Sequence, residues 1–127
     1  MNDLTVLERA VLGAATAGSH PVLTRLRGQL DGLRVASREL TGHGFFTDLA
    51  VRDPASALPS RDDLAIHGVN VEMDGLAHGA GFVLFVAKGL LATLEGFAFD
   101  EPWPAQPENW RITAAPVKIM GRSTPPE

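Results

Sequence analysis

Few side chains of this 127-residue sequence are candidates for catalysis or metal binding, and the histidines come first. Cysteine is absent, which excludes disulfides, thiolate nucleophiles and zinc-thiolate sites. His43, His67 and His78 are of a type that binds metal ions. Carboxylates such as Asp74 or Glu95 could complete such a site. No two histidines have the helical i, i+4 spacing or the short strand spacing that pre-forms one, so we predict no metal site.

Two glycine-rich turns, Gly42-His43-Gly44 and Gly79-Ala80-Gly81, are candidates for a phosphate loop. Neither continues into GxGxxG or GxxxxGK[ST], and neither opens a predicted helix. We therefore expect these glycines to permit a β-bulge or a close approach of backbones. The sequence also lacks a GxSxG motif for a serine hydrolase. Together these patterns predict no catalytic residue and no cofactor.

Among the carboxylates, Glu95 is the candidate for an unusual environment, because it lies within an apolar strand segment. If Lys88 and Gly89 form a two-residue turn, Glu95 points to the same side as Phe82 and Phe97, and one interpretation is a buried acid with a raised pKa. The alternative is an ion pair with a strand arginine such as Arg38, or a position at the edge of the sheet. The candidates for a ligand pocket are Arg38, Thr41 and Glu95.

The segment Asp100-Glu101-Pro102-Trp103-Pro104 combines a large amphipathic ring, a stiff backbone and two acids. These are the properties of an interface anchor, so Asp100, Glu101 and Trp103 are candidates for binding a basic protein partner. The alternative is a packed loop whose tryptophan closes one end of the core.

Charge is distributed unevenly along the chain. Residues 1–60 hold six acids and six arginines, whereas residues 61–108 hold eight acids against one arginine and one lysine, a net of −6. The whole chain has a formal charge of −4. A protein of this charge is not expected to bind nucleic acid through a basic surface.

The predicted secondary structure begins with two helices. Thr5-Val6-Leu7-Glu8 has the pattern of a capping box, which predicts a first helix from about Thr5 to Ala17. Ser19-His20-Pro21 predicts the start of a second helix that ends near Gly32. The short connection between them predicts an antiparallel helical hairpin.

Alternating and apolar segments then predict strands. A central hairpin is expected from Phe82–Ala87 and Leu90–Phe99, and a last edge strand from Trp110–Val117. The predicted fold class is α+β, with the helical hairpin packed on an antiparallel sheet of four to six strands. Residues 1–120 are expected to form one domain and residues 121–127 a flexible tail. Because both faces of the central hairpin are apolar, we also predict a homodimer.

Three phrases of the sequence resemble the motifs of a protein family. They are Arg38–Thr47 (RELTGHGFFT), Gly79–Phe85 (GAGFVLF) and Leu94–Pro104 (LEGFAFDEPWP). The family consists of uncharacterised small bacterial proteins with the motifs R-x-x-T-G-x-G-F-F-T, G-A-G-F-x-L-F and L-E-G-x-x-x-D-E-x-W-P, and the likeness covers roughly residues 4–105. It implies a bacterial, cytoplasmic, single-domain protein and no particular activity.

Two classes of function remain open. The first is a non-enzymatic binding protein, either an immunity-type protein or a homo-oligomeric interaction module. The second is a small enzyme or small-molecule-binding domain that uses Arg38 and Glu95 in a pocket at the central hairpin. The lack of nucleophile, metal and phosphate motifs favours the first. The N-terminal residues lack the pattern of a signal peptide, and no stretch has the length of a membrane span, so a cytoplasmic location is expected.

Overall fold

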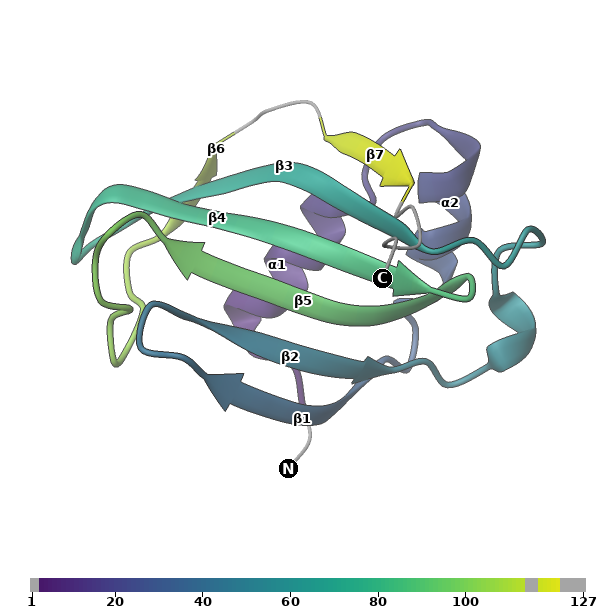
Figure 1. The fold of residues 1–127 in the computed structure, drawn as a ribbon, viewed down its shortest axis with the longest axis horizontal. Coiled ribbons are helices and arrows are strands. Elements are labelled where there is room, and N and C mark those ends of the chain that lie inside the picture. Colours follow the sequence, from purple (N-terminus) through teal and green to yellow (C-terminus); the bar gives the residue numbers. More distant parts are fainter. Residues whose placement is uncertain (1–2, 114–116, 122–127) are drawn as a thin grey trace, which may run out of the picture.

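The computed structural model describes residues 3–113 and 117–121 and has the α+β architecture that the sequence predicts. Two N-terminal helices precede an antiparallel sheet of seven strands (Figure 1). In chain order the elements are α1 (Val6–Ala15), α2 (Pro21–Gly28), β1 (Arg34–Leu40), β2 (Gly44–Ala50), the 3-10 helix η1 (Pro54–Ser56), β3 (Leu64–Met73), β4 (Leu76–Ala87), β5 (Leu90–Ala98), β6 (Arg111–Thr113) and β7 (Lys118–Gly121). Neither helix of this described part is long and apolar enough to span a membrane.

The strands form one sheet in the order β1-β2-β5-β4-β3-β6, and β7 also pairs with β3. The predicted hairpin, β4 and β5, therefore lies in the middle of the sheet. The prediction of four to six strands is too low, because the segment predicted as the last strand contains β6 and a further strand that was not predicted, β7, follows it. β6 and β7 pair with different parts of β3, and residues 114–116 between them lie outside the described residues, as do residues 122–127 of the predicted tail.

The first helix begins as the sequence predicts, at a capping box formed by Thr5 and Glu8. The Glu8 N–H donates to Thr5 Oγ1 (3.0 Å), and the Thr5 N–H donates to Glu8 Oε1 (2.8 Å). These two bonds satisfy backbone donors that a helix start leaves without partners. The second helix begins after His20 as expected but ends at Gly28, earlier than the predicted end near Gly32.

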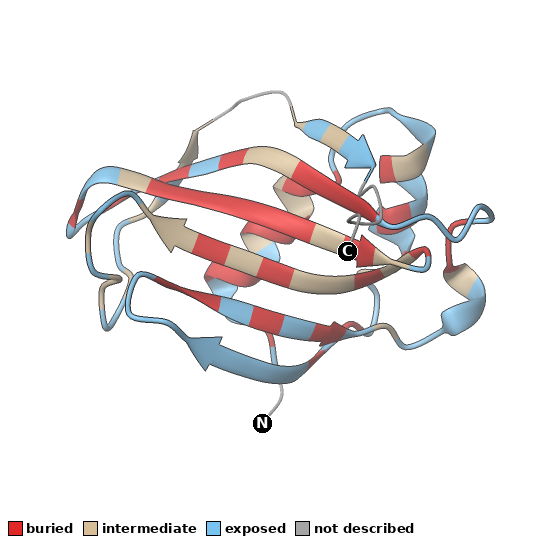
Figure 2. Ribbon diagram, in the orientation of Figure 1, coloured by how far each residue is buried: buried red, intermediate tan, exposed pale blue. Residues whose placement is uncertain are grey.

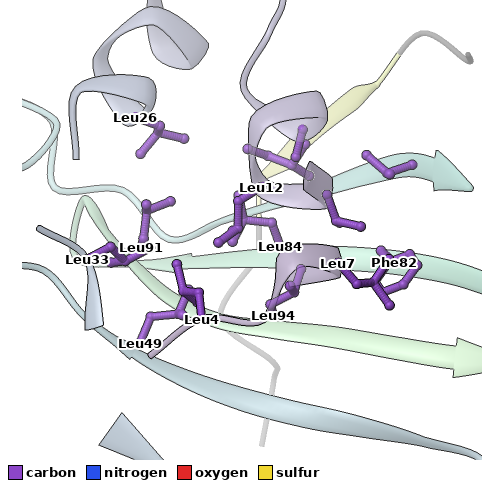
Figure 3. Close-up of a cluster of buried hydrophobic side chains, with 14 of the residues drawn as sticks. Leu4, Leu7, Leu12, Leu26, Leu33, Leu49, Phe82, Leu84, Leu91 and Leu94 are labelled. Carbon is purple, nitrogen blue, oxygen red and sulfur yellow. The ribbon is translucent and has the colours of Figure 1, made fainter. Parts of the chain in front are cut away.

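The two helices cover one face of the sheet, and the core lies between these two layers (Figure 3). Leu12 of α1 and Leu26 of α2 belong to the same cluster as Leu84, Leu91 and Leu94 of the central hairpin. None of the five is more than 2 % exposed. Burial of these leucines against the helices stabilises the arrangement, since each buried side chain of this size contributes about 1.5–3 kcal/mol.

A β-bulge in the central hairpin decides which way Glu95 points. The register of β4 against β5 shifts at residues 85–86, so that Val83 pairs with Glu95. The sequence alone predicts that Val83 pairs with Leu94. Because neighbouring residues of a strand point to opposite faces, the shift turns Leu94 toward the helices and Glu95 away from them. The expectation that Glu95 shares a face with Phe82 is therefore wrong.

The face of the sheet that points away from the helices has no covering element among the described residues. Phe46 and Phe99 lie on this open face and are 37 % and 42 % exposed. Val83 in its centre is buried by its neighbours. At the edge of the sheet, β1 is exposed over most of its length (Figure 2).

A buried glutamine ties the turn of the central hairpin to the helical layer. Gln29 follows α2, is 2 % exposed and uses its whole carboxamide. Its Nε2 donates to the carbonyl oxygens of Ser56 (3.0 Å) and Gly89 (2.9 Å), and its Oε1 accepts from the Leu91 N–H (2.9 Å). One side chain thus joins the end of α2, the η1 segment and the β4–β5 turn.

Gly44 allows the first two strands to pack closely against the hairpin. A Cβ atom at this position would lie 1.9 Å from the carbonyl oxygen of Gly96 in the neighbouring strand. No side chain fits at this position, because the backbones of β2 and β5 approach each other too closely. This agrees with the interpretation of the Gly42-His43-Gly44 turn as a packing feature.

We expect Gly44→Ala to lower the free energy of unfolding by at least about 2 kcal/mol, because the strands must separate to admit the methyl group. Gly13→Ala is the matched control, since a Cβ atom at this position of α1 meets nothing within 4 Å. That variant should gain up to about 1 kcal/mol from helix propensity. Urea unfolding measures both, and equal stability of the two variants would contradict the packing interpretation.

Candidate functional site

An apolar groove lies at the end of the sheet where the β1–β2 turn meets α1. Its volume is about 530 Å³, within the range of roughly 300–1,000 Å³ that ligand pockets have. Its walls come from residues 5–8 at the start of α1, from Leu40 and Phe45 around the β1–β2 turn, and from residues 103–107 with Trp110. The only two tryptophans of the chain therefore line one groove.

Trp103 is held in the wall of the groove by two other aromatic rings, Phe45 and Phe82. The ring centroids of Phe45 and Trp103 are 5.3 Å apart and those of Phe82 and Trp103 are 6.3 Å apart, both in edge-to-face geometry. Phe45 and Phe82 pack over Gly96, where a Cβ atom would collide with both rings. The backbone N–H of Trp103 also donates to the carbonyl oxygen of Gly42 (2.8 Å). The loop after β5 is thus fixed to the β1–β2 turn.

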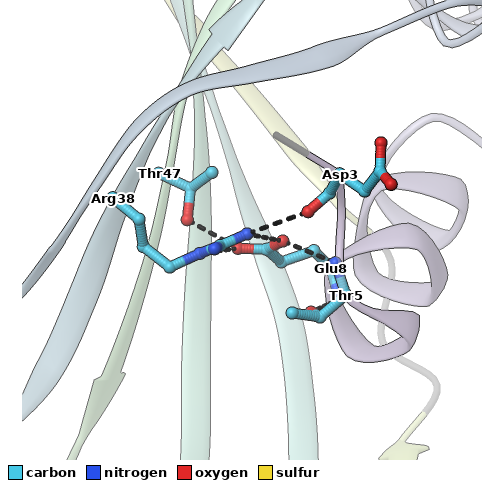
Figure 4. Close-up of polar contacts among 5 residues, drawn as sticks. All are labelled: Asp3, Thr5, Glu8, Arg38 and Thr47. Atoms are coloured by element: carbon cyan, nitrogen blue, oxygen red, sulfur yellow. Dashed lines mark hydrogen bonds and ion pairs between the residues drawn. The ribbon is translucent and has the colours of Figure 1, made fainter. Parts of the chain in front are cut away.

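The polar end of the groove is a buried carboxylate with a guanidinium group (Figure 4). Arg38 donates from Nη2 to Glu8 Oε1 (2.6 Å) and from Nε to Glu8 Oε2 (3.0 Å). The Thr47 hydroxyl donates to Glu8 Oε2 (2.6 Å), and the Thr5 N–H donates to Oε1. The Glu8 side chain is 2 % exposed, whereas the Arg38 side chain is 32 % exposed.

The hydrogen bonds decide the protonation state of this carboxylate. Burial alone raises the pKa of Glu8, because water no longer solvates the charge. The hydrogen bonds from Arg38, Thr47 and the Thr5 backbone, together with the positive charge of Arg38, outweigh that effect and lower the pKa. Glu8 is therefore ionised at neutral pH and forms a charged pair with Arg38.

The structure separates the predicted pocket residues. Arg38 lines the groove on the helical side, and Thr41 lies in the exposed β1–β2 turn, where its N–H donates to the carbonyl oxygen of Gly44 (2.9 Å). Glu95 points to the open face, opposite Phe46 and Val83. Arg38 and Glu95 are thus on opposite faces of the sheet, and the partner of Arg38 is a helix residue instead. The pocket that the sequence predicts from these two residues does not form.

The pKa of Glu95 is raised above its ordinary value, although its position differs from the one the sequence suggests. The physical cause is partial burial among its neighbours on the open face, and the charge of His67 opposes the shift. The aromatic neighbour at the paired position of β2 is Phe46.

The predicted partner-binding segment divides into residues with different surroundings. Trp103 is half-buried and packs against the core, so it both closes that end of the core and lines the groove. The Glu101 carboxylate accepts the N–H groups of Ala77 (2.8 Å) and His78 (3.0 Å), and these hydrogen bonds lower its pKa. Asp100 is exposed and has a positive φ of 60°. Glu101 thus holds the start of β4.

The histidines are not gathered around a metal ion. Among residues 3–113 and 117–121 no group of three His, Cys, Asp or Glu side chains is close enough to bind one. His43 Nδ1 lies 3.1 Å from the carbonyl oxygen of Glu101, in the contact between the two turns. A polar hollow beside the β3–β4 turn has a volume of about 720 Å³. Its walls contain an ion pair of Glu72 with Arg111 and a hydrogen bond from Asn109 to Asp74 (2.8 Å).

Two residues of the groove were missed by sequence reasoning. Glu8 gives a capping signal in the sequence, but nothing in its spacing indicates that Arg38 and Thr47 meet it from the sheet. Trp110 lies in a segment predicted as an edge strand. A search for tryptophans close to prolines could have found both, since Pro104 and Pro107 stand between Trp103 and Trp110.

Comparisons with protein-family models, with curated proteins and with solved structures found no match to this chain. The resemblance to a family of small bacterial proteins therefore stays a prediction. The structure does bring its phrases together, because Arg38, Phe82 and Trp103 lie around one end of the sheet.

We expect Glu8→Gln to lower the free energy of unfolding by about 2–4 kcal/mol at neutral pH, because Arg38 loses its buried anion. The pKa of Glu8 is lower in the folded protein than its ordinary value of 4.5, so the charged pair stabilises the fold fully above that pH. This contribution decreases as the pH falls through the pKa of the folded state. The difference between wild type and variant should therefore shrink in acid.

The control is Glu72→Gln, which removes an ion pair on the surface. Glu72 and Arg111 are 62 % and 75 % exposed, so the loss should stay below about 1 kcal/mol. Chemical unfolding across a series of pH values measures both variants. A Glu8→Gln curve that stays parallel to wild type down to low pH would show that Glu8 is not the titrating group.

Proposed function

We propose that this protein is a small non-enzymatic binding protein whose binding site is the apolar groove beside α1. The observation that carries this proposal is the position of both tryptophans, Trp103 and Trp110, in one concave site of about 530 Å³. A concave, largely apolar site with a few polar groups is the usual form of a binding site. Tryptophan is enriched where binding energy is concentrated.

The chemistry of the groove favours binding over catalysis. Its charged side chains, Glu8 and Arg38, hydrogen-bond to each other, and Glu8 has four donors around its two oxygens. A general base must be able to accept a substrate proton, whereas the hydrogen bonds to Glu8 engage both of its oxygens and lower its pKa, which makes it a weak base. The enzyme alternative with Arg38 and Glu95 loses its support, because the two residues lie on opposite faces.

A neutral fluorescent probe, N-phenyl-1-naphthylamine, tests the groove directly. The chain contains no tyrosine, so its near-ultraviolet emission reports Trp103 and Trp110. We expect saturable enhancement of the probe's emission with a matching loss of tryptophan emission. A probe signal without any change at the tryptophans would place the binding elsewhere and contradict the proposal.

Leu40→Glu should weaken probe binding by about tenfold, because it places a charge at the mouth of the groove. Leu40 is 74 % exposed, so the fold should not change. The matched control is Met120→Glu, in which another exposed apolar residue (51 %) outside the groove becomes acidic. Equal weakening by both substitutions would indicate a general effect of charge.

A second candidate function is homo-oligomerisation through the open face of the sheet. Phe46 and Phe99 are partly exposed there, and Phe97 packs against Phe99 with ring centroids 5.4 Å apart. A second copy of the chain offers the same apolar surface, as a two-fold dimer requires.

Sedimentation at micromolar concentration should then give a dimer for the wild type and a monomer for Phe46→Asp with Phe99→Asp. The paired control is Leu40→Glu, which alters the helical side of the sheet only. A monomer for the wild type would remove this candidate without affecting the groove.

A basic protein partner stays a prediction of the charge distribution. Residues 61–108 contain eight acids and only two basic residues, and Asp100 within this segment is exposed. The carboxylate of Glu101 is engaged by two backbone N–H groups, so any such partner has fewer free acids to meet than the sequence indicates. We include a bacterial, cytoplasmic origin in this proposal, and only the sequence supports it.

A further inference from the structure

The groove presents one accessible charge, and that charge is positive. Among the described residues, Glu8 and Arg38 are the only charged ones that line it. The Glu8 side chain is 2 % exposed and lies behind its hydrogen-bond donors, whereas the Arg38 side chain is 32 % exposed. Arg38 is therefore the more accessible of the two charged groups that line the groove.

Arg38 keeps donors for a second acceptor. A guanidinium group has five N–H bonds, and the hydrogen bonds of Arg38 to described residues use Nε and Nη2. Nη1 and its two N–H bonds are not used by these contacts. Arginine commonly binds a carboxylate through charge-assisted hydrogen bonds of this kind.

The rest of the groove fits an apolar body. Val6 and Leu40 border it and are 75 % and 74 % exposed, which is unusual for large aliphatic side chains. The half-buried tryptophans form the opposite wall on a segment that Pro104 and Pro107 stiffen. Covering these side chains would remove apolar surface from water with little loss of chain entropy.

We propose that the groove binds an amphipathic carboxylate, a molecule with an apolar or aromatic body and one acidic head, and that the head is held by Arg38. This proposal rests on the groove being the binding site. The chain as a whole carries −4, so long-range attraction does not draw an acid in. Selectivity for the acid must then come from direct contact with the guanidinium group.

The test compares three probes with one body on the wild-type protein: 4-phenylbutyrate, 4-phenylbutanol and 4-phenylbutylamine. Each is titrated against tryptophan emission and against bound N-phenyl-1-naphthylamine. We expect the acid to bind about tenfold more tightly than the alcohol, and the amine to bind most weakly. Both readouts should give the same order.

The outcomes separate the two levels of the proposal. Equal binding of acid and alcohol at the tryptophans would keep the groove as a binding site and overturn its preference for acids. Stronger binding of the amine would do the same. Absence of binding by all three probes and by the naphthylamine would overturn the groove as a site altogether.

Arg38→Lys tests the assignment of the acid head. It keeps the positive charge for Glu8 but loses the planar fork, so the preference for acid over alcohol should fall to near unity while the alcohol binds as before. A purely structural role of Arg38 would weaken both ligands equally and would overturn the assignment. Thermal unfolding of the variant confirms that it is folded during the measurement.

The acid head could belong to a free small acid or to the carboxyl terminus of a peptide. A short peptide ending in phenylalanine, with either a free or an amidated carboxyl group, distinguishes these sources. Tighter binding of the free-acid peptide than of 4-phenylbutyrate supports a chain terminus as the natural ligand, and the reverse supports a small acid. Equal binding of the free and the amidated peptide would contradict recognition of the carboxylate.

Discussion

The fold depends on one ionised carboxylate that has been removed from water. Glu8 stands at the start of α1, and its two oxygens collect donors from α1 itself, from β1 and from β2. A buried charge without partners costs several kcal/mol, so each of these donors must be in place when the helix docks. The network thereby fixes the position of the helix along the sheet, which leucine packing alone does not specify. It also sets where the groove begins, because the same Arg38 forms its polar end.

Local chemistry made some of these features predictable. The Thr5–Glu8 capping box follows from residues three apart, and the central hairpin follows from two apolar runs around Lys88-Gly89. The pairing of Arg38 with Glu8 joins residues that are thirty positions apart and has no local signal. The bulge at residues 85–86 was also unpredictable, since several pairings of two apolar strands bury similar surface. That single shift places Glu95 on the face opposite to Arg38 and removes the alternative pocket that combined these two residues.

The groove is built from residues that also hold the fold, and this limits how it can vary. Phe45 and Trp103 pack against the core, and Gly96 is covered by rings that leave no space for a side chain. Substitutions at these positions change stability as well as binding. Val6 and Leu40 are different, because they are exposed and border the groove without supporting the core. The shape of the mouth can therefore change at these two positions at little structural cost.

The buried carboxamide of Gln29 has a consequence for how the chain folds. Its three hydrogen bonds reach residues that are 27, 60 and 62 positions away. Until η1 and the central hairpin have both reached α2, the amide would be desolvated without its partners, which penalises any compact state that has only part of them. Partly assembled intermediates are thus destabilised relative to both the unfolded and the native chain. The glutamine makes the loss of the hairpin turn and the loss of the helical layer a single cooperative event.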